Sequence, residues 1–164
     1  MSVALAATGG SVALLVASLA LVALVAAVGG AATAHSVGDW YEGLDRAPWN
    51  PPAWLFGPAW TILYVLMALA AWLVARQGLD DAAVRTALAL YGLQLALNLG
   101  WTLVFFGLRL PGVALAVIVA LFVAIAATAI AFYGVSPAAA WLLVPYLAWV
   151  AFAATLNAWI VVAN

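Results

Sequence analysis

Long apolar runs that carry almost no charge constrain the fold of this chain more than any other feature. Only 5% of the 164 residues are charged and 71% are hydrophobic, whereas a soluble domain carries about 25% charged residues. No water-soluble fold can hide this much apolar surface, so we predict an integral membrane protein. A membrane span needs about 20 apolar residues, and five segments reach that length. The expected spans are approximately residues 8–34, 54–75, 84–107, 113–133 and 139–162.

The spans are predicted to be α-helices, because backbone N–H and C=O groups in lipid have to be satisfied within their own segment. Strands of a membrane barrel alternate polar and apolar residues, and these runs do not. We therefore expect an all-α integral membrane protein, a bundle of five transmembrane helices that forms a single domain over residues 1–164. A long structured loop, residues 35–53, joins the first two spans, and the two ends of the chain lie on opposite sides of the membrane.

The arginines leave the orientation of this bundle open. Arg46 and Arg109 lie on the side of the long loop, and Arg76 and Arg85 lie on the other side. The positive-inside rule needs an excess of positive charge on one side, and here the two sides are equal. The alanine-rich, lysine-free composition suggests a prokaryote, so we expect the protein in a prokaryotic plasma membrane.

The stretch from Trp40 to Tyr64 is the most distinctive part of the chain, because tryptophan and proline are concentrated there. Pro48, Pro51 and Pro52 each fix φ and remove a backbone donor, so this part cannot be one continuous helix. We expect a stiff, extended loop that covers a site. A helix follows it, with Pro58 in the first turn, where a missing N–H costs little.

Three of the predicted helices place aromatic and polar side chains on one face at helical spacing. The second helix aligns Trp60, Tyr64, Met67 and Ala71. The third aligns Tyr91, Gln94, Asn98, Trp101 and Phe105, and the fifth aligns Leu142, Tyr146, Trp149, Ala153 and Asn157. Such faces are expected to meet inside the bundle.

Gln94 and Asn98 are amides near the middle of the third span. An amide that faces lipid costs a few kcal/mol, so both are expected to point into the bundle. Two interpretations remain open: hydrogen bonds between helices, or contact with a ligand, which the aromatic residues on the same face favour. Trp101 and Trp149 lie well inside their spans, away from the membrane interfaces where tryptophan is common.

Several kinds of site are excluded by residues that the sequence lacks. There is no cysteine, so there is no disulfide and no zinc-thiolate site. No carboxylate lies in a predicted span, which argues against a proton relay, and a net charge of −1 offers no basic patch for nucleic acid. No metal site is predicted, and the single histidine, His35, is either a solvated loop residue or a haem ligand. What remains is an apolar, tryptophan-rich cavity that suits a flat hydrophobic ligand.

Three motifs make the sequence resemble the translocator protein family, whose members are also called tryptophan-rich sensory proteins or peripheral benzodiazepine receptors. The first motif, from Trp40 to Tyr64, is W-Y-x-x-L-x-x-x-P-W-N-P-P-x-W-x-F-x-P-x-W-T-x-L-Y. The second, from Gln94 to Phe106, is Q-L-x-x-N-x-x-W-x-x-x-F-F. The third, from Trp141 to Asn157, is W-L-L-x-P-Y-L-x-W-x-x-F-A-x-x-L-N.

The resemblance implies a receptor or sensor, usually a homodimer within membrane lipid, with a pocket beneath the first loop. It implies that the pocket binds porphyrins such as protoporphyrin IX, and synthetic benzodiazepine-site drugs, and that regulation of tetrapyrrole levels is the purpose. No cofactor is expected, because the porphyrin is the ligand. The helical faces and the resemblance together predict these ligand-binding residues: Trp40, Trp49, Pro51, Trp54, Trp60, Tyr64, Gln94, Asn98, Trp101, Phe105, Tyr146, Trp149 and Ala153.

Two alternative functions remain open. Some bacterial members of the family degrade protoporphyrin in light and oxygen with two pocket tryptophans, which match Trp60 and Trp149 and would then be catalytic. The other alternative is a transporter of porphyrin or sterol-like ligands, although the chain lacks the inverted repeats and intramembrane charge of coupled transporters. The sterol motif of the animal proteins is also absent, because Ala158 and Val162 stand where that motif has a tyrosine and a basic residue.

Overall fold

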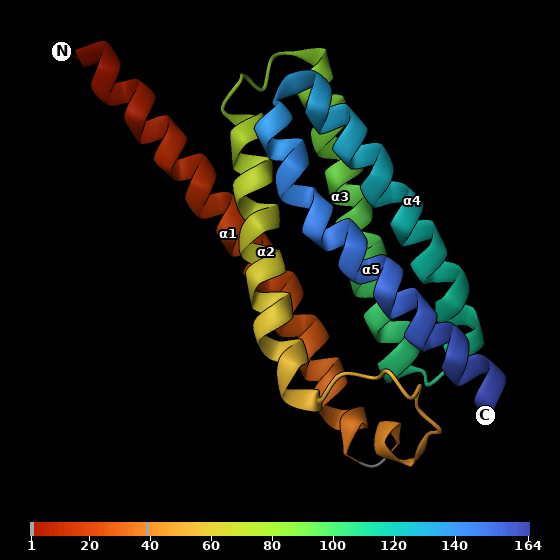
Figure 1. Cartoon of the computed structure of the whole chain (residues 1–164). Helices are drawn as coiled ribbons and strands as arrows, with labels where there is room; N and C mark the ends of the chain where they lie inside the picture. Colours follow the sequence, from red (N-terminus) through yellow and green to blue (C-terminus); the bar gives the residue numbers. More distant parts are fainter. Residues whose placement is uncertain (1, 39) are drawn as a thin grey trace.

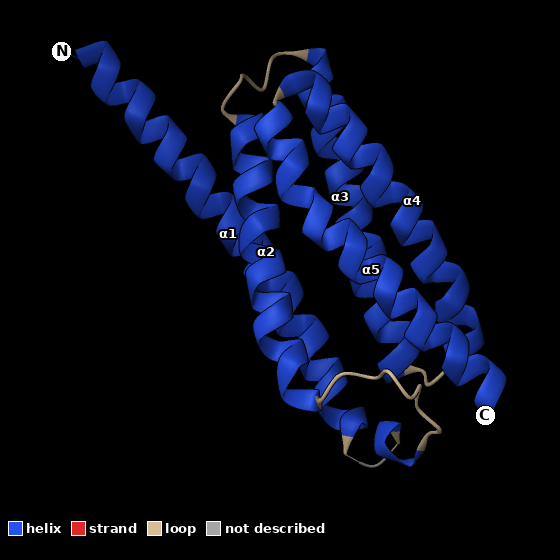
Figure 2. Ribbon diagram, in the orientation of Figure 1, coloured by secondary structure: helices blue, strands red, loops and turns tan. Residues whose placement is uncertain are grey.

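The computed structural model of the chain describes residues 2–38 and 40–164, apart from the side chains of residues 2–9 and 35. Asp39 and the side chain of His35 therefore lie outside the described residues. Within the described part, the structure is built from helices without strands (Figures 1 and 2). Its long helices are α1 (Ser2–Val37), α2 (Ala53–Ala75), α3 (Ala82–Thr102), α4 (Pro111–Val135) and α5 (Pro137–Ala163). The predicted all-α membrane bundle is confirmed.

Five segments of the described chain are long and apolar enough to cross a membrane. They are Gly10–Ala34, Ala53–Ala75, Ala82–Gly107, Pro111–Val135 and Pro137–Ala163. Each end lies within two residues of the end expected from the sequence. Hydropathy alone therefore located the spans, because a helix that faces lipid must be apolar across the whole hydrocarbon core.

The segment between the first two spans is less extended than expected. The α1 helix continues to Val37, and a short 3₁₀ turn, η1, covers Tyr41–Gly43. Both are possible because no proline occurs before Pro48 in this segment. Residues 44–52, which contain three prolines, are non-helical as predicted. Because α2 begins at Ala53, Pro58 lies in its second turn and not in the first, which corrects the prediction.

The loop is anchored at several points to the ends of other helices. The Ser36 hydroxyl, at the end of α1, donates to the carbonyl of Phe106. The backbone N–H of Asp45 donates to Oδ1 of Asn164 over 3.1 Å, and the Ala47 side chain is only 5% exposed. The loop is therefore held across the ends of α3 and α5 and is not free in solvent.

The helices are packed unequally. The α4 helix packs against both α3 and α5, whereas α1 lies mainly against α2, and its N-terminal half projects away from the bundle (Figure 1). In the most apolar 18-residue stretch of α1 only 17% of the residues are buried, compared with 39% in the corresponding stretch of α2. Most of the α1 surface is therefore not covered by the rest of the chain, and its C-terminal half makes the closer contacts with the bundle (Figure 1).

The two ends of α3 are shaped by local chemistry. At its start, the Asp81 carboxylate accepts a hydrogen bond from the backbone N–H of Ala83 over 2.7 Å, which caps the helix. At its end, the helix widens into a π-helical turn, η2 (Leu103–Gly107). Arg109 then adopts a left-handed φ of 58° in the turn that leads to α4.

We expect Asp81→Ala to destabilise the protein by about 1 kcal/mol, because the first turn of α3 loses its side-chain acceptor. The neighbouring Asp80 is also exposed, but its carboxylate is not seen to cap the helix, so Asp80→Ala is the matched control. Thermal unfolding in detergent, followed by circular dichroism, measures both variants. Equal unfolding temperatures for the two variants would contradict the capping role.

Candidate ligand-binding site

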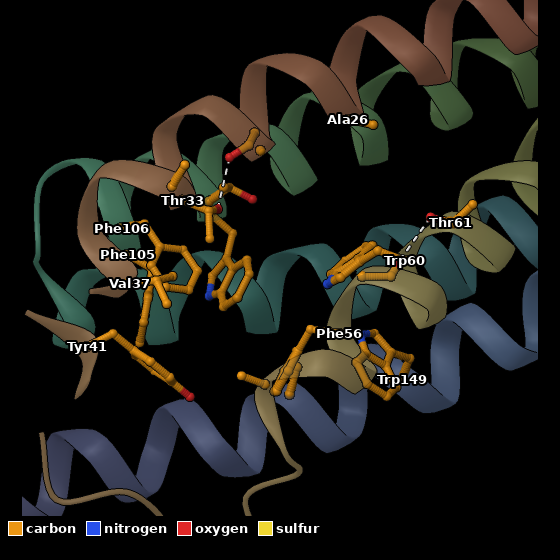
Figure 3. A pocket seen from close by; sticks show the side chains of 18 of the residues that line it. Ala26, Thr33, Val37, Tyr41, Phe56, Trp60, Thr61, Phe105, Phe106 and Trp149 are labelled. Carbon is orange, nitrogen blue, oxygen red and sulfur yellow. Dashed lines mark hydrogen bonds between the residues drawn. The ribbon is translucent and has the colours of Figure 1, made fainter. Parts of the chain in front are cut away.

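A cavity of about 980 Å³ lies in the half of the bundle that the loop covers. Its walls come from α1, α2, the end of α3 with η2, and α5, and loop residues line one end. Six of the predicted ligand-binding residues line it: Trp60, Tyr64, Trp101, Phe105, Trp149 and Ala153. The structure thus brings together aromatic side chains from separate spans around one space, as the helical faces predicted (Figure 3).

One aromatic group of the cavity is formed between α2 and α5. The rings of Phe56 and Trp149 meet edge to face with their centroids 5.8 Å apart. Trp60 lies beside Tyr64 at 5.5 Å, with the two rings tilted by 32°. Figure 3 shows Phe56, Trp60 and Trp149 gathered at one side of the cavity. These rings offer flat apolar faces to a ligand.

A second aromatic group lies at the loop side of the cavity. Trp101 and Phe105 are stacked with centroids 5.4 Å apart, and Tyr41 lies 5.7 Å from Phe106. Figure 3 places Tyr41, Phe105 and Phe106 well apart from the first group, with open space between the two. A flat molecule that fills the cavity therefore meets aromatic rings at both of its ends.

The indole of Trp101 is held in place by its polar edge. Its Nε1–H donates to Oδ1 of Asn157 over 3.1 Å, and Nδ2 of Asn157 donates to the carbonyl of Pro111 over 2.9 Å. This chain joins α3, α5 and the start of α4. Since the indole N–H is already satisfied, Trp101 can contribute only its apolar surface to a ligand.

Asn98 and Tyr146 lie behind the cavity wall, although they were predicted to contact a ligand. Both are fully buried, at 1% and 0% exposure, and neither lines the cavity. The Tyr64 hydroxyl donates to Oδ1 of Asn98 over 2.9 Å, and Nδ2 of Asn98 donates to the Tyr146 hydroxyl over 3.0 Å. Asn98 therefore links α2, α3 and α5. This arrangement agrees with the first of the two interpretations, hydrogen bonds between helices, and not with contact with a ligand.

Gln94 fits neither interpretation that the sequence left open. Its side chain is 1% exposed and is not among the residues that line the cavity. Neither its oxygen nor its nitrogen has a hydrogen-bond partner among the described residues, and the same holds for the Tyr91 hydroxyl one turn earlier. Such a buried, unpaired group costs about 1–3 kcal/mol, and nothing in the described structure offsets that cost.

The four loop-side residues predicted to cover the ligand do not line the cavity. Trp40 packs edge to face on Phe105 at 5.5 Å, outside the wall. Trp49 is 51% exposed and meets Trp159 at 5.2 Å, and Pro51 borders a small separate hollow in the loop.

Trp54 is 71% exposed, which has a simple geometric cause. It lies six residues before Trp60 on α2, and this separation turns the two side chains about 120° apart at 3.6 residues per turn. Because Trp60 faces the cavity, Trp54 faces outward. Its position at the start of a span matches the interfacial belt where tryptophan is common.

Several lining residues were missed from the sequence. The α1 wall is made of small residues, including Gly29, Gly30 and Thr33. Small residues in a membrane span are also typical of surfaces where helices pack together, so a cavity next to them leaves no separate signal in the sequence. Phe56, also missed, lies four residues before Trp60, and that helical spacing could have identified it.

The loop contributes Tyr41, Glu42, Arg46 and Asn50 to the cavity lining, and none of these was predicted. The Tyr41 hydroxyl donates to Oδ1 of Asn50 over 3.0 Å. Burial raises the pKa of the Tyr41 phenol, although the nearby charge of Arg46 and the hydrogen bond to Asn50 both act to lower it. Tyr41 therefore stays neutral at physiological pH.

Comparison with known proteins identifies the family of this chain. The TspO/MBR family model matches residues 17–162. The human protein named translocator protein is 48% identical over 120 residues, which cover 72% of this chain and 70% of that protein. The tryptophan-rich protein TspO of Archaeoglobus fulgidus is 41% identical over 144 residues, 87% of this chain and 92% of its own. The tryptophan-rich sensory protein of Cereibacter sphaeroides is 46% identical over 119 residues, 73% of each chain. This chain belongs to the TspO/MBR family.

Proposed function

We propose that this protein is a membrane receptor that binds porphyrins, of the protoporphyrin IX type, in the cavity between α1, α2 and α5. The observation that carries the proposal is that Trp60, Trp101 and Trp149, from three different helices, line one apolar cavity. Its volume of about 980 Å³ is at the upper end of the range of about 300–1,000 Å³ that is usual for small-molecule sites. A wide, flat and mostly apolar ligand fits these dimensions and surfaces.

The polar groups in the middle of the cavity are already occupied, which also favours an apolar ring system. The hydroxyls of Thr33 and Thr61 donate to the carbonyls of Gly29 and Gly57 in their own helices, each over 2.9 Å. Thr102 donates in the same way to the carbonyl of Asn98 over 3.2 Å. These threonines therefore have no free donor for a ligand, and the centre of the cavity acts as an apolar slot.

We interpret this porphyrin binding as serving a sensory role. The Cereibacter sphaeroides relative, which is 46% identical to this chain over 119 residues, carries the name tryptophan-rich sensory protein. In our proposal, occupancy of the cavity reports tetrapyrrole levels in a prokaryotic plasma membrane. Relatives in bacteria and in an archaeon are consistent with that location.

We expect Trp149→Ala to weaken protoporphyrin IX binding by roughly tenfold, because the ligand loses one ring of the cavity wall. Trp141→Ala is the matched control, since Trp141 lies on the same helix but is exposed and outside the cavity. Titration of the purified protein in nanodiscs, followed by quenching of the remaining tryptophan fluorescence, measures the affinities. Saturable binding that Trp149→Ala leaves unchanged would show that the porphyrin sits elsewhere.

Light-driven oxidation of the bound porphyrin is the second candidate function. The observation that favours it is that the indoles of Trp60 and Trp149 line the same cavity from α2 and α5. In this scheme the excited porphyrin takes an electron from an indole and passes it to dioxygen, which becomes superoxide. The indole radical cation then takes an electron back from the porphyrin, and the porphyrin radical cation combines with superoxide, so that both oxygen atoms end on the oxidised ring. The apolar cavity would keep the radical pair away from water.

We expect illumination in air to bleach the Soret band of the bound porphyrin faster than that of porphyrin in empty nanodiscs. Replacing both tryptophans, as Trp60→Phe with Trp149→Phe, keeps an aromatic ring at each position but removes the more easily oxidised indoles, so bleaching should slow several-fold. Absorbance measured against illumination time tests this. Equal bleaching rates in the wild type and the double variant would exclude catalysis by these residues and leave the binding proposal intact.

A further inference from the structure

The cavity is electrically uneven along its length. Among the described lining residues, only Glu42 and Arg46 carry charge, and both come from the loop. The opposite end is formed by Trp60, Trp149 and the apolar residues around them. A ligand with a polar edge therefore has a single end of the cavity at which that edge can be solvated or paired.

Arg46 is held at this charged end by its surroundings. Its guanidinium carbon lies 5.8 Å from the centre of the Tyr41 ring, a cation–π contact. On one side of it in the sequence, the backbone of Asp45 is bonded to Asn164. On the other side, Ala47 is buried and its carbonyl accepts from the N–H of Asn50 over 2.8 Å. The backbone that carries Arg46 is thus fixed over the cavity end.

The other polar groups at this end are engaged with one another. The Tyr41 hydroxyl donates to Asn50, and Nδ2 of Asn50 donates to the carbonyl of Pro51 over 3.0 Å. Arginine has five N–H donors in a planar fork that matches a carboxylate. Within the described part of the chain, the Arg46 guanidinium makes the cation–π contact with Tyr41 and no hydrogen bond or ion pair. Among the described residues at this end, Arg46 is therefore the side chain whose donors are available to a ligand.

We propose that Arg46 is a specificity-determining residue that binds a carboxylate on one edge of the cavity ligand. The inference rests on the proposed porphyrin binding and adds the chemical class and orientation of the ligand. A tetrapyrrole with acid side chains along one edge lies with that edge at Arg46, and its apolar edge lies against Trp60 and Trp149. Neutral porphyrins of the same shape bind without this contact.

Glu42 strengthens the preference for one orientation of the ligand's acid edge. It lies in η1 and also lines the cavity, so an anionic edge that strays from Arg46 meets a like charge. Like-charge contacts disfavour a wrong pose at little cost to the correct one. The pair therefore fixes the position of the acid edge, and a ligand with two adjacent acids must place both on the Arg46 side.

The test compares protoporphyrin IX with its dimethyl ester, which has the same ring but no negative charge. Both are titrated into the wild type, Arg46→Gln, Arg46→Lys and Arg109→Gln in phosphatidylcholine nanodiscs. Arg109 lies on the same side of the membrane but outside the cavity lining, so it controls for general charge at that surface. The readout is the ratio of acid affinity to ester affinity, in which the partitioning of each ligand into lipid cancels between variants.

We expect Arg46→Gln to lower this ratio by about three- to fivefold, the worth of an ion pair close to solvent. Arg46→Lys should retain part of the preference, and Arg109→Gln should retain all of it. Unchanged ester affinity shows that the variants are folded with an intact cavity.

Several results would overturn the inference. An unchanged ratio in Arg46→Gln would do so, because the acid edge of the ligand would then bind independently of the guanidinium. Equal weakening of the acid and the ester would also do so, because it would indicate a structural role. If the wild type bound neither porphyrin, the proposed function would fail and the inference with it. Binding of both without discrimination by Arg46 refutes the inference alone.

Discussion

Lipid offers no hydrogen bonds, so polar side chains inside the spans have to satisfy one another, and the chain through Tyr64, Asn98 and Tyr146 is the clearest case. It connects α2, α3 and α5 through two hydrogen bonds of 2.9 and 3.0 Å, and its members Asn98 and Tyr146 are fully buried. The three helices are thereby fixed in rotation as well as in position. The tryptophans that line the cavity sit on these same helices, so their direction depends on this link.

The sequence was sufficient to predict most of the fold, and six of the thirteen predicted ligand-binding residues line the cavity. Hydropathy located the spans, because the length of an apolar run is set by the membrane itself. Helical periodicity correctly directed Trp60 and Trp149 toward a shared interior. Periodicity gives the direction of a side chain but not the depth at which it stops. For that reason Asn98 and Gln94, on the same face as Trp101, could not be recognised as lying behind the wall.

The remaining part of the site depends on contacts between distant segments. Trp49 and Trp54 belong to the most distinctive motif, yet they pack outward, whereas Arg46 and Asn50 line the cavity. The placement of the loop residues Trp49, Arg46 and Asn50 follows from the anchoring of the loop to Asn164 and Phe106, which are far away in the sequence. The α1 wall could not be predicted from the sequence either, because glycine and alanine form a cavity wall by leaving space unfilled, and this gives no pattern of its own.

The self-satisfied threonines of the cavity have a further consequence for the range of compounds that can occupy it. Where the hydroxyls of a cavity donate to carbonyls of their own helices, shape and dispersion mainly decide which ligands bind. A missing or added methylene changes affinity by only about 1–3 kcal/mol in such surroundings, and strong rejection requires an unmet hydrogen bond. The middle of the cavity should therefore accept many different flat aromatic molecules. Discrimination between ligands of similar shape has to come from polar groups at the rim of the cavity.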